Sequence, residues 1–226
     1  TKWIRFANTL GMRIALRASN VANTELTQVF FNDLDEGETM QSNEDMAKII
    51  PDAEGPTYHV KNPISYVYGW QEIRISETLM NFLNGYNDPR TPVFAEPNED
   101  GEFIGLRNGQ PGDSLGLRYN SYYKPHFCNI GEFFIKDSTP HYLITYAEAC
   151  FLKAEAVEKG LMTGNVQTYY EEGIRASLEQ FGITNETAIN TIAKQIQDLI
   201  DHHGPDSFAM YVSGQMSYEA QYIANK

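Results

Sequence analysis

The sequence contains little cysteine and no long apolar run. Two cysteines, Cys128 and Cys150, occur among 226 residues, which excludes a disulfide-rich scaffold, and their spacing fits no metal motif. Cys150 falls on the apolar stripe of a predicted helix, so we expect a buried free thiol there, while one disulfide stays open as an alternative. No stretch approaches the roughly 18 consecutive apolar residues of a membrane helix, so we expect a soluble chain.

Basic residues are also scarce. There are 17 lysines and arginines against 30 aspartates and glutamates, and the net charge is −13. Binding to nucleic acid needs clusters of basic side chains, so the composition excludes it. The fingerprints of hydrolases, metalloproteases, nucleotide-binding loops and dinucleotide-binding folds are missing as well. No enzyme class is therefore indicated by a motif.

The stretch from Pro140 to Phe181 has the pattern of two antiparallel helices, because apolar and small residues recur at steps of three and four in both halves. These residues are Leu143, Tyr146, Ala147, Cys150, Phe151, Ala154 and Val157, followed by Val166, Tyr169, Tyr170, Gly173, Ile174, Ser177, Leu178 and Phe181. We expect Thr139 to cap the first helix, and Gly160 and Gly182 to end the two helices. A unit of about 40 residues with this pattern is typical of helical-repeat proteins and needs neighbouring helices.

Further helices are expected at 3–21, 25–34, 76–83 and 184–203. The apolar residues of the first helix predict a buried stripe of Trp3, Phe6, Ala7, Leu10, Ile14 and Ala18. Arg13 and Arg17 lie one turn apart on it, so they either reach acidic partners on a neighbouring helix or remain solvated.

Residues 22–139 are mostly irregular by pattern, which is far longer than ordinary connections and is typical of a functional segment. Within it, 53–68 is expected to be loop or extended chain, interrupted by prolines. Residues 98–101, Asn-Glu-Asp-Gly, predict a hairpin turn between short strands at Phe94 and at 103–104.

This irregular segment is rich in tyrosine and tryptophan. Aromatic rings can stack on the C–H faces of sugars, and neighbouring amide, carboxylate and guanidinium groups can bind the hydroxyls. Any one of these aromatic residues can instead serve packing, but the set predicts a ligand-binding surface. Its members are Tyr58, Tyr66, Tyr68, Trp70, Tyr86, Tyr119, Tyr122 and Tyr123.

The sequence predicts no metal site and no cofactor. The acidic run 33–38, Asp-Leu-Asp-Glu-Gly-Glu, resembles the start of a calcium loop, but its glycine falls one place early and no closing glutamate follows at the right spacing. An EF-hand is therefore excluded, and a looser structural calcium site stays open without further support. His202 and His203 are adjacent on a predicted helix, so they point about 100° apart and do not favour chelation of one ion.

Four stretches, in order, resemble the SusD/RagB family, in particular its SusD-like branch from Bacteroidetes. The first runs from Trp3 through Phe6-Ala7-Asn8 to Arg17. The second begins with Ser76-x-x-Leu79 and leads to Asp88-Pro89-Arg90, and the third begins with Phe103-x-Gly105-Leu106. The fourth is the helical hairpin, with Thr145-Tyr146-Ala147-Glu148 and Tyr170-Glu171-x-Gly173-Ile174.

The resemblance implies a mainly α-helical fold of tetratricopeptide-like helix pairs, with a loop-rich excursion and a short β-hairpin. It implies one SusD-like domain over 1–226, incomplete at both ends, with a helical scaffold at 1–21 and 140–203 and a ligand-facing excursion at 22–139. It also implies a non-enzymatic outer-membrane lipoprotein, surface-exposed, whose anchor is not in this chain. Such a protein binds oligosaccharides for nutrient uptake and delivers them to a SusC-like TonB-dependent transporter.

Two other functions remain alternatives from the sequence. The helix pairs can form a helical-repeat module that binds a protein or peptide. The many acidic residues can also include the carboxylate pair of a glycoside hydrolase, but the sequence does not place two of them across a sugar.

Overall fold

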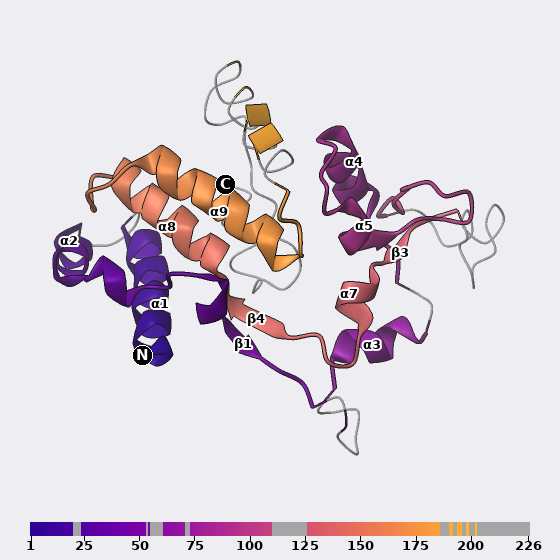
Figure 1. The fold of residues 1–226 in the computed structure, drawn as a ribbon, viewed down its shortest axis with the longest axis horizontal. Helices are drawn as coiled ribbons and strands as arrows, with labels where there is room; N and C mark the ends of the chain where they lie inside the picture. The colour runs from indigo at the N-terminus through magenta and orange to yellow at the C-terminus, as the bar shows by residue number, and fades with distance from the viewer. Residues whose placement is uncertain are drawn as a thin grey trace. The chain divides into compact units, whose positions relative to one another are not determined.

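The structure, a computed structural model, describes residues 1–19, 24–52, 54, 61–70, 73–109, 126–185, 190, 191, 194, 195, 198 and 202. The chain divides into two compact units (Figure 1). Unit 1 comprises Thr1–Ile49 and Tyr142–Lys226, and unit 2 comprises Ile50–His141. Unit 2 is thus one continuous stretch of sequence, and unit 1 is made of the two stretches on either side of it.

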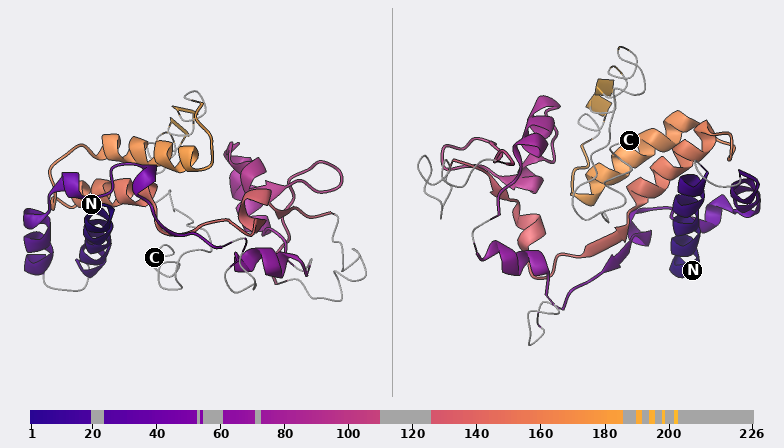
Figure 2. Two further views of the ribbon diagram at one scale, coloured as in Figure 1. Left: turned by 60° about the horizontal axis from the view of Figure 1, so that its bottom comes forward. Right: turned by 180° about the vertical axis from the view of Figure 1, so that it is seen from behind.

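Unit 1 is a set of helices with two short strands. Its elements are α1 (Lys2–Ala18), α2 (Thr24–Asp33), the 3-10 turns η1 (Glu36–Glu38) and η2 (Asn43–Asp45), β1 (Ala47–Ile49), β4 (His141–Ile144), α8 (Tyr146–Glu158) and α9 (Val166–Gln180). Strands β1 and β4 form a two-stranded sheet where the chain leaves unit 1 and where it returns. Helices α8 and α9 lie side by side along their length (Figures 1 and 2).

The α8–α9 hairpin confirms the predicted pair of helices. Gly160 and Gly182 follow the two helices with φ of +68° and +78°, the left-handed conformation that glycine adopts most easily. Leu161 N donates to Ala156 O, and Ile183 N donates to Leu178 O, so both ends are closed by the same type of cap.

The predicted start of α8, the first helix of this hairpin, is wrong. Residues 141–144 form β4, and α8 begins after Thr145, whose Oγ1 accepts a hydrogen bond from Glu148 N. Thr145 and Glu148 have the spacing of a capping box, which is a stronger start signal than a threonine followed by proline. Leu143, assigned to the apolar helix face, therefore lies on the strand and is 52% exposed.

Helix α1 is confirmed, but its predicted buried stripe is correct only in part: Phe6 and Leu10 are partly buried against Met40, Ile144 and Ala149, whereas Trp3 and Ile14 are not buried. The buried residues are Thr9, Met12, Ala15 and Leu16, and they pack with Phe31, Leu152 and Ala156 of α2 and α8. Trp3 is 80% exposed and Ile14 is 60% exposed. The helix has apolar residues on two faces, and the face with methionine and leucine is the one that α2 and α8 cover.

Arg13 shows that the predicted acidic partner exists. Its Nε and one terminal nitrogen donate to the two carboxylate oxygens of Glu148, each at 2.6 Å, which joins α1 to α8.

Helices α8 and α9 approach closely at Gly173, where a Cβ atom would lie 2.7 Å from the Phe151 ring. The hairpin therefore depends on the missing side chain at residue 173.

Unit 2 contains short elements. They are α3 (Pro63–Tyr68), α4 (Glu77–Gly85), α5 (Thr91–Phe94), β2 (Ala95–Glu96), β3 (Asn129–Ile130) and α7 (Glu132–Ile135). Its core contains the buried residues Met80, Leu83, Ala95 and Cys128. Helix α4 packs on α5, α5 on α7, and α7 on α3.

Two predictions within unit 2 need correction. The turn at 98–101 is confirmed, since Gly101 N donates to Asn98 O and Gly101 has φ +79°. Its predicted strands are wrong, because Phe94 ends α5 and β2 pairs antiparallel with β3, Ala95 opposite Ile130. The expected loop at 53–68 is wrong over its last six residues, which form α3. Pro63 lies in the first turn of this helix, where a backbone N–H has no partner within the helix, so the proline loses no hydrogen bond there.

Both cysteines are free and buried, with exposures of 0% for Cys128 and 1% for Cys150. Burial raises the pKa of the Cys150 thiol to about 11.

Among the residues that the structure describes, none of the helices has the length and apolar character needed to span a membrane. Of the helix expected at 184–203, the described residues 190, 191, 194, 195, 198 and 202 are helical, residues 184 and 185 are not, and the others lie outside the described residues.

Candidate functional site

Two of the predicted aromatic residues, Tyr66 and Trp70, form an exposed pair. Tyr66 lies on α3 and Trp70 in the turn that follows it. A separation of four residues brings side chains to the same side of a helical turn. The ring centroids are 5.4 Å apart and the ring planes meet at 70°. Tyr66 is 51% exposed and Trp70 is 54% exposed, so each ring keeps about half of its surface for a ligand.

The edge-to-face geometry of this pair has a chemical consequence. An aromatic ring has a negative face and a positive edge, so one ring contacts the other edge-on in a favourable way. The two exposed surfaces are therefore not coplanar. A ligand that contacts both rings therefore has to present apolar C–H groups in two directions.

Polar groups surround the N-terminal end of α3. Lys61 Nζ and Asp137 Oδ2 form an ion pair at 2.8 Å, and Ser65 Oγ lies 2.7 Å from Asp137 Oδ1. Hydrogen bonds from Lys61 and Ser65 hold the pKa of the Asp137 carboxyl below its usual range. Sequence reasoning missed Lys61, Asn62, Ser65 and Asp137. The dipeptide Asn62-Pro63, a capping residue before a proline, was the signal that could have located this helix start.

Tyr68 is also on α3 and is partly exposed. It interacts electrostatically with Arg74, whose pKa is lowered by burial while the tyrosine opposes that shift. The structure thus places three of the predicted residues, Tyr66, Tyr68 and Trp70, within one and a half helical turns.

Tyr86 does not join this group. It follows α4 and packs against Phe82 of the same helix, with ring centroids 4.7 Å apart. Helices α3 and α4 lie at opposite ends of unit 2 in every view (Figures 1 and 2). Tyr86 is therefore better explained by packing at the end of α4.

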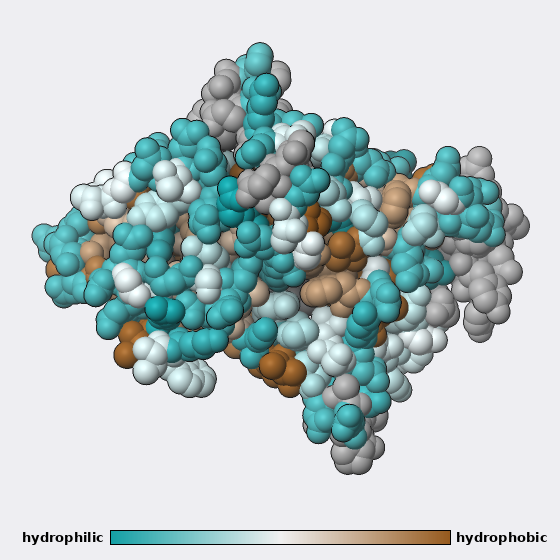
Figure 3. Space-filling view, in the orientation of Figure 1, coloured by the Kyte–Doolittle hydropathy of each residue, from teal (hydrophilic) through white to brown (hydrophobic). Residues whose placement is uncertain are grey.

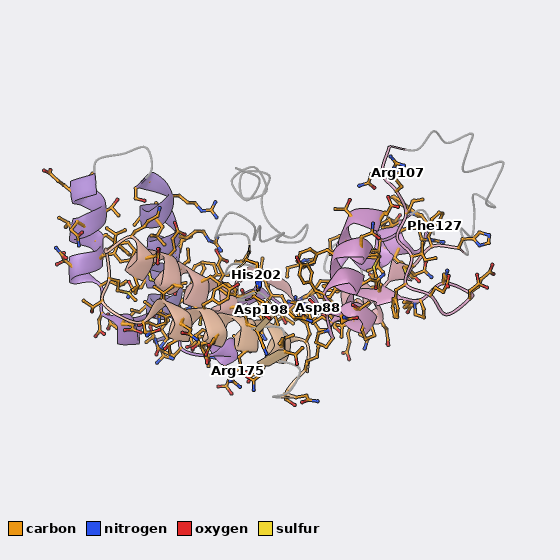
Figure 4. The ribbon with its side chains drawn as sticks, turned by 90° about the horizontal axis from the view of Figure 1, so that it is seen from above. Asp88, Arg107, Phe127, Arg175, Asp198 and His202 are labelled. Atoms are coloured by element: carbon orange, nitrogen blue, oxygen red, sulfur yellow. The ribbon has the colours of Figure 1, made fainter. Side chains whose placement is uncertain are left out.

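Four predicted residues, Tyr58, Tyr119, Tyr122 and Tyr123, lie outside the described residues. The segment that contains the last three connects two neighbouring points of unit 2. Cys128 N donates to Ile104 O at 2.8 Å, and Arg107 and Phe127, which flank the segment, lie at the same end of the unit (Figure 4).

Several acidic residues in the described part of the chain make structural contacts. Asp45, Asp88 and Glu148 each pair with an arginine: Arg5 at 2.8 Å, Arg90 at 2.6 Å and Arg13 at 2.6 Å. In the run that resembles a calcium loop, Asp35 Oδ1 accepts from Gly37 N, and Glu36 accepts a hydrogen bond from Tyr169 Oη at 2.7 Å.

A metal site receives no support among the described residues, where no cluster of three or more histidine, cysteine, aspartate or glutamate side chains could hold an ion.

The surface in Figure 3 is mostly hydrophilic, with apolar side chains exposed at separate places. The most exposed large apolar side chains of α1 and α2 are Trp3 at 80% and Leu26 at 72%. These side chains belong to unit 1, whereas the Tyr66–Trp70 pair belongs to unit 2.

Comparison with known proteins agrees with this fold. Residues 1–225 match the SusD-like family described as "Starch-binding associating with outer membrane". The chain belongs to this family. No curated protein matches the sequence. Members of the family are thus described as associated with the outer membrane and with starch.

Solved structures give the same result. A SusD-like protein from Bacteroides thetaiotaomicron shares 32% identity, with a TM-score of 0.65 over 84% of this chain and 37% of that one. A chitin-binding protein shares 20% identity, with a TM-score of 0.68 over 86% and 44%. A SusD homologue from Bacteroides fragilis shares 18% identity, with a TM-score of 0.66 over 99% and 50%. The chain thus spans half or less of these three structures, and the mainly helical SusD-like fold is confirmed.

Proposed function

We propose that this chain binds oligosaccharides at the cell surface, as part of an outer-membrane lipoprotein, and delivers them to a SusC-like TonB-dependent transporter. The observation that carries the proposal is the exposed Tyr66–Trp70 pair. Membership of a family described as starch-binding supports it. So does the printed name of one similar structure, a chitin-binding protein.

The binding surface in this proposal is centred on α3. Tyr66 and Trp70 supply apolar ring surface for the C–H faces of sugars, while the Tyr66 hydroxyl and Lys61 supply polar groups for hydroxyls. Tyr68 is two residues from both rings and lies on another side of the helix. Sites of this kind combine aromatic walls with a few polar groups that fix orientation. Tyr58, Tyr119, Tyr122 and Tyr123 are proposed as further contacts on the sequence argument alone.

We also propose that the chain binds without catalysis. Hydrolysis of a glycoside needs two carboxyl groups facing one sugar bond. Three of the buried or half-buried acids among the described residues, Asp45, Asp88 and Glu148, pair with arginines, which supports structural roles for these three. An assay for new reducing ends after incubation with starch and chitin checks this, and product release would contradict it.

The binding test is calorimetry with maltoheptaose and with chitohexaose as probes. If Trp70 stacks on a sugar, Trp70→Ala removes apolar contact worth about 1.5 kcal/mol, so binding weakens about tenfold. Tyr66→Ala is expected to act in the same direction. Tyr122→Ala tests the second group of tyrosines.

Trp3→Ala is the matched control, because it removes the other tryptophan, which lies on α1 in unit 1. It is expected to leave glycan binding unchanged. If Trp70→Ala and Tyr66→Ala bind both probes as tightly as the parent protein, the proposed site is wrong.

The exposed apolar face of α1 favours a second candidate, a helical-repeat module that binds a protein or peptide. Trp3 and Ile14 lie on this face and are 80% and 60% exposed. In this case neither probe gives heat, and a SusC-like transporter is retained from solubilised membranes by the parent protein but not by Trp3→Ala.

A further inference from the structure

The helix that presents the candidate pair cannot hold its own position. Helix α3 has six residues and none of them is buried. Isolated helices shorter than about 12–15 residues are marginal in water, so propensity alone does not form this one. The direction of the Tyr66 and Trp70 rings therefore depends on the contacts at the start of α3.

Asn62 makes most of these contacts. It is 1% exposed, although it is polar. Its Oδ1 accepts from Ile64 N at 3.1 Å and caps α3. Its Nδ2 donates to Phe134 O at 2.7 Å and to Lys136 O at 2.9 Å. Its backbone N donates to Asp137 O at 2.9 Å.

The two acceptors of Asn62 Nδ2 lie at the end of another helix. Helix α7 ends at Ile135, and the last carbonyls of a helix have no partner within it. One buried amide thus caps the start of α3 and the end of α7 together. Each donor and acceptor of the Asn62 side chain has a partner, which is the condition under which a buried polar group stabilises one arrangement.

Asp137 adds a second connection between the same two segments. Its carboxylate lies 2.8 Å from Lys61 Nζ and 2.7 Å from Ser65 Oγ. Ser65 Oγ is also 2.7 Å from Asn62 O, and its single hydrogen can be donated to one acceptor at a time. Lys61 and Ser65, which lie on either side of the Asn62 cap in the sequence, therefore both contact Asp137 in the segment after α7.

We propose that Asn62 and Asp137 are positioning residues for glycan binding, which fix α3 against α7 and thereby set the orientation of the Tyr66 and Trp70 rings. This inference rests on the proposed function, since it names what prepares that site. A rigid platform loses less freedom when a ligand binds, so its affinity depends on the two residues although neither has to touch the sugar.

Asn62→Asp separates the two roles of the asparagine. An aspartate still caps a helix start, but it cannot donate to the Phe134 and Lys136 carbonyls. Asp137→Asn removes the charge that pairs with Lys61 and keeps the size of the side chain. Ser76→Ala is the matched control, because Ser76 Oγ caps α4 in the same unit, at the end away from α3.

The experiment uses a Trp3→Phe parent, in which Trp70 is the one remaining tryptophan, since the sequence has two. Three quantities are measured: the dissociation constant for the probe that binds best among maltoheptaose and chitohexaose, the near-ultraviolet circular dichroism of Trp70, and the melting temperature. We expect Asn62→Asp and Asp137→Asn to weaken binding about tenfold and to reduce the Trp70 dichroism. Ser76→Ala lowers the melting temperature and leaves the other two unchanged.

The outcomes separate this inference from the proposed function. If Trp70→Ala loses binding but Asn62→Asp and Asp137→Asn bind like the parent, the site stands and the positioning role is wrong. If Ser76→Ala weakens binding as much as Asn62→Asp, the effect reflects general stability and the positioning role is again wrong. If Trp70→Ala itself binds like the parent, the proposed site is wrong and the positioning role is wrong with it.

Discussion

At the scale of single residues, unit 2 depends on places where two backbone segments come very close. Gly131 N donates to Phe94 O at 2.9 Å, and a Cβ on Gly131 would lie 1.9 Å from Val93 O. No side chain fits at this distance, and the atom that it meets belongs to the backbone, which cannot rotate away. The glycine therefore fixes how closely the start of α7 approaches α5.

We predict that Gly131→Ala destabilises unit 2 by about 2–4 kcal/mol, because the backbone has to move apart. Gly85→Ala is the control. Gly85 is at the end of α4 with nothing within 4 Å of an added Cβ, and alanine there is expected to be neutral or to stabilise by up to about 1 kcal/mol. Denaturant unfolding of both variants in the Trp3→Phe parent, followed by Trp70 fluorescence, measures the two effects. An unchanged midpoint for Gly131→Ala would contradict the prediction.

The ionisation of Asp137 gives a prediction for pH. Its pKa is lowered in the folded protein by hydrogen bonds from Lys61 and Ser65, and the unfolded chain has the ordinary value of about 3.9. The folded state thus binds the proton less tightly. The contribution is complete above the ordinary value and is lost as the pH falls through the lowered folded value.

We expect the difference in unfolding midpoint between the parent protein and Asp137→Asn to be constant from pH 7 to about pH 5 and to shrink below about pH 4. Denaturant titrations at a series of pH values measure it. A difference that stays the same at pH 3 would show that the charge of Asp137 contributes nothing.

At the scale of elements, the strongest sequence patterns were the α8–α9 hairpin and the existence of α1. The hairpin was predictable because its period and its two terminal glycines indicate the same structure. The buried face of α1 was predictable only for Phe6 and Leu10. The face with Met12 and Leu16 was not, because apolar residues occupy two sides of the helix and the pattern does not show which side α2 and α8 cover. The start of α8 was misplaced because the strand residues 141–144 continue the apolar spacing of the helix.

The candidate site was predictable in part. The sequence pattern predicts Tyr66, Tyr68 and Trp70 as candidate contacts, but it indicates an interruption at Pro63, which in the structure is the first residue of α3. The pairing of Tyr66 with Trp70 therefore did not follow from the sequence. The cap by Asn62 depends on carbonyls more than seventy residues later, which no local pattern contains.

The connection between α1 and α8 leads to a prediction about two elements. Arg13 and Glu148 form two charged hydrogen bonds of 2.6 Å, with side chains 24% and 29% exposed. Bonds of this bidentate type contribute about 1.5–3 kcal/mol. We expect Arg13→Ala and Glu148→Ala each to destabilise unit 1 by about this amount, and the double variant by little more than either one.

Glu155→Ala is a suitable comparison, because it removes the partly exposed pair with Lys159, four residues away at the end of α8, and leaves the contact of Lys159 with Ser19 in place. Such pairs contribute about 0.3–0.5 kcal/mol. Thermal unfolding of the parent protein, the two single variants and the double variant gives the double-mutant cycle. Additive effects of Arg13→Ala and Glu148→Ala would show that the two side chains act independently.

At the scale of the whole molecule, the chain combines two units with a strongly negative charge. The net charge of −13 creates a potential that repels anions over distances limited by salt. If oligosaccharides bind as proposed, neutral ones are favoured over those that carry carboxylate or sulfate groups.

We predict that oligogalacturonate of seven units binds more weakly than maltoheptaose, and that its binding improves from 20 to 300 mM salt while that of maltoheptaose does not, because salt screens the repulsion of an anionic ligand at roughly 10 Å and beyond. Calorimetry at the two salt concentrations measures this. Tighter binding of the anionic oligomer at low salt would overturn the prediction.

The division of unit 1 by unit 2 also has a consequence for synthesis on the ribosome. Helix α1 is made before α8, because Glu148, the partner of Arg13, follows 135 residues later. At a rate of about 5–20 residues per second, α1 waits roughly ten seconds for α8 to emerge. Met12 and Leu16, buried in the finished protein, are without that cover for this time and are natural sites for a chaperone. Unit 2 is continuous in sequence and is free to fold first.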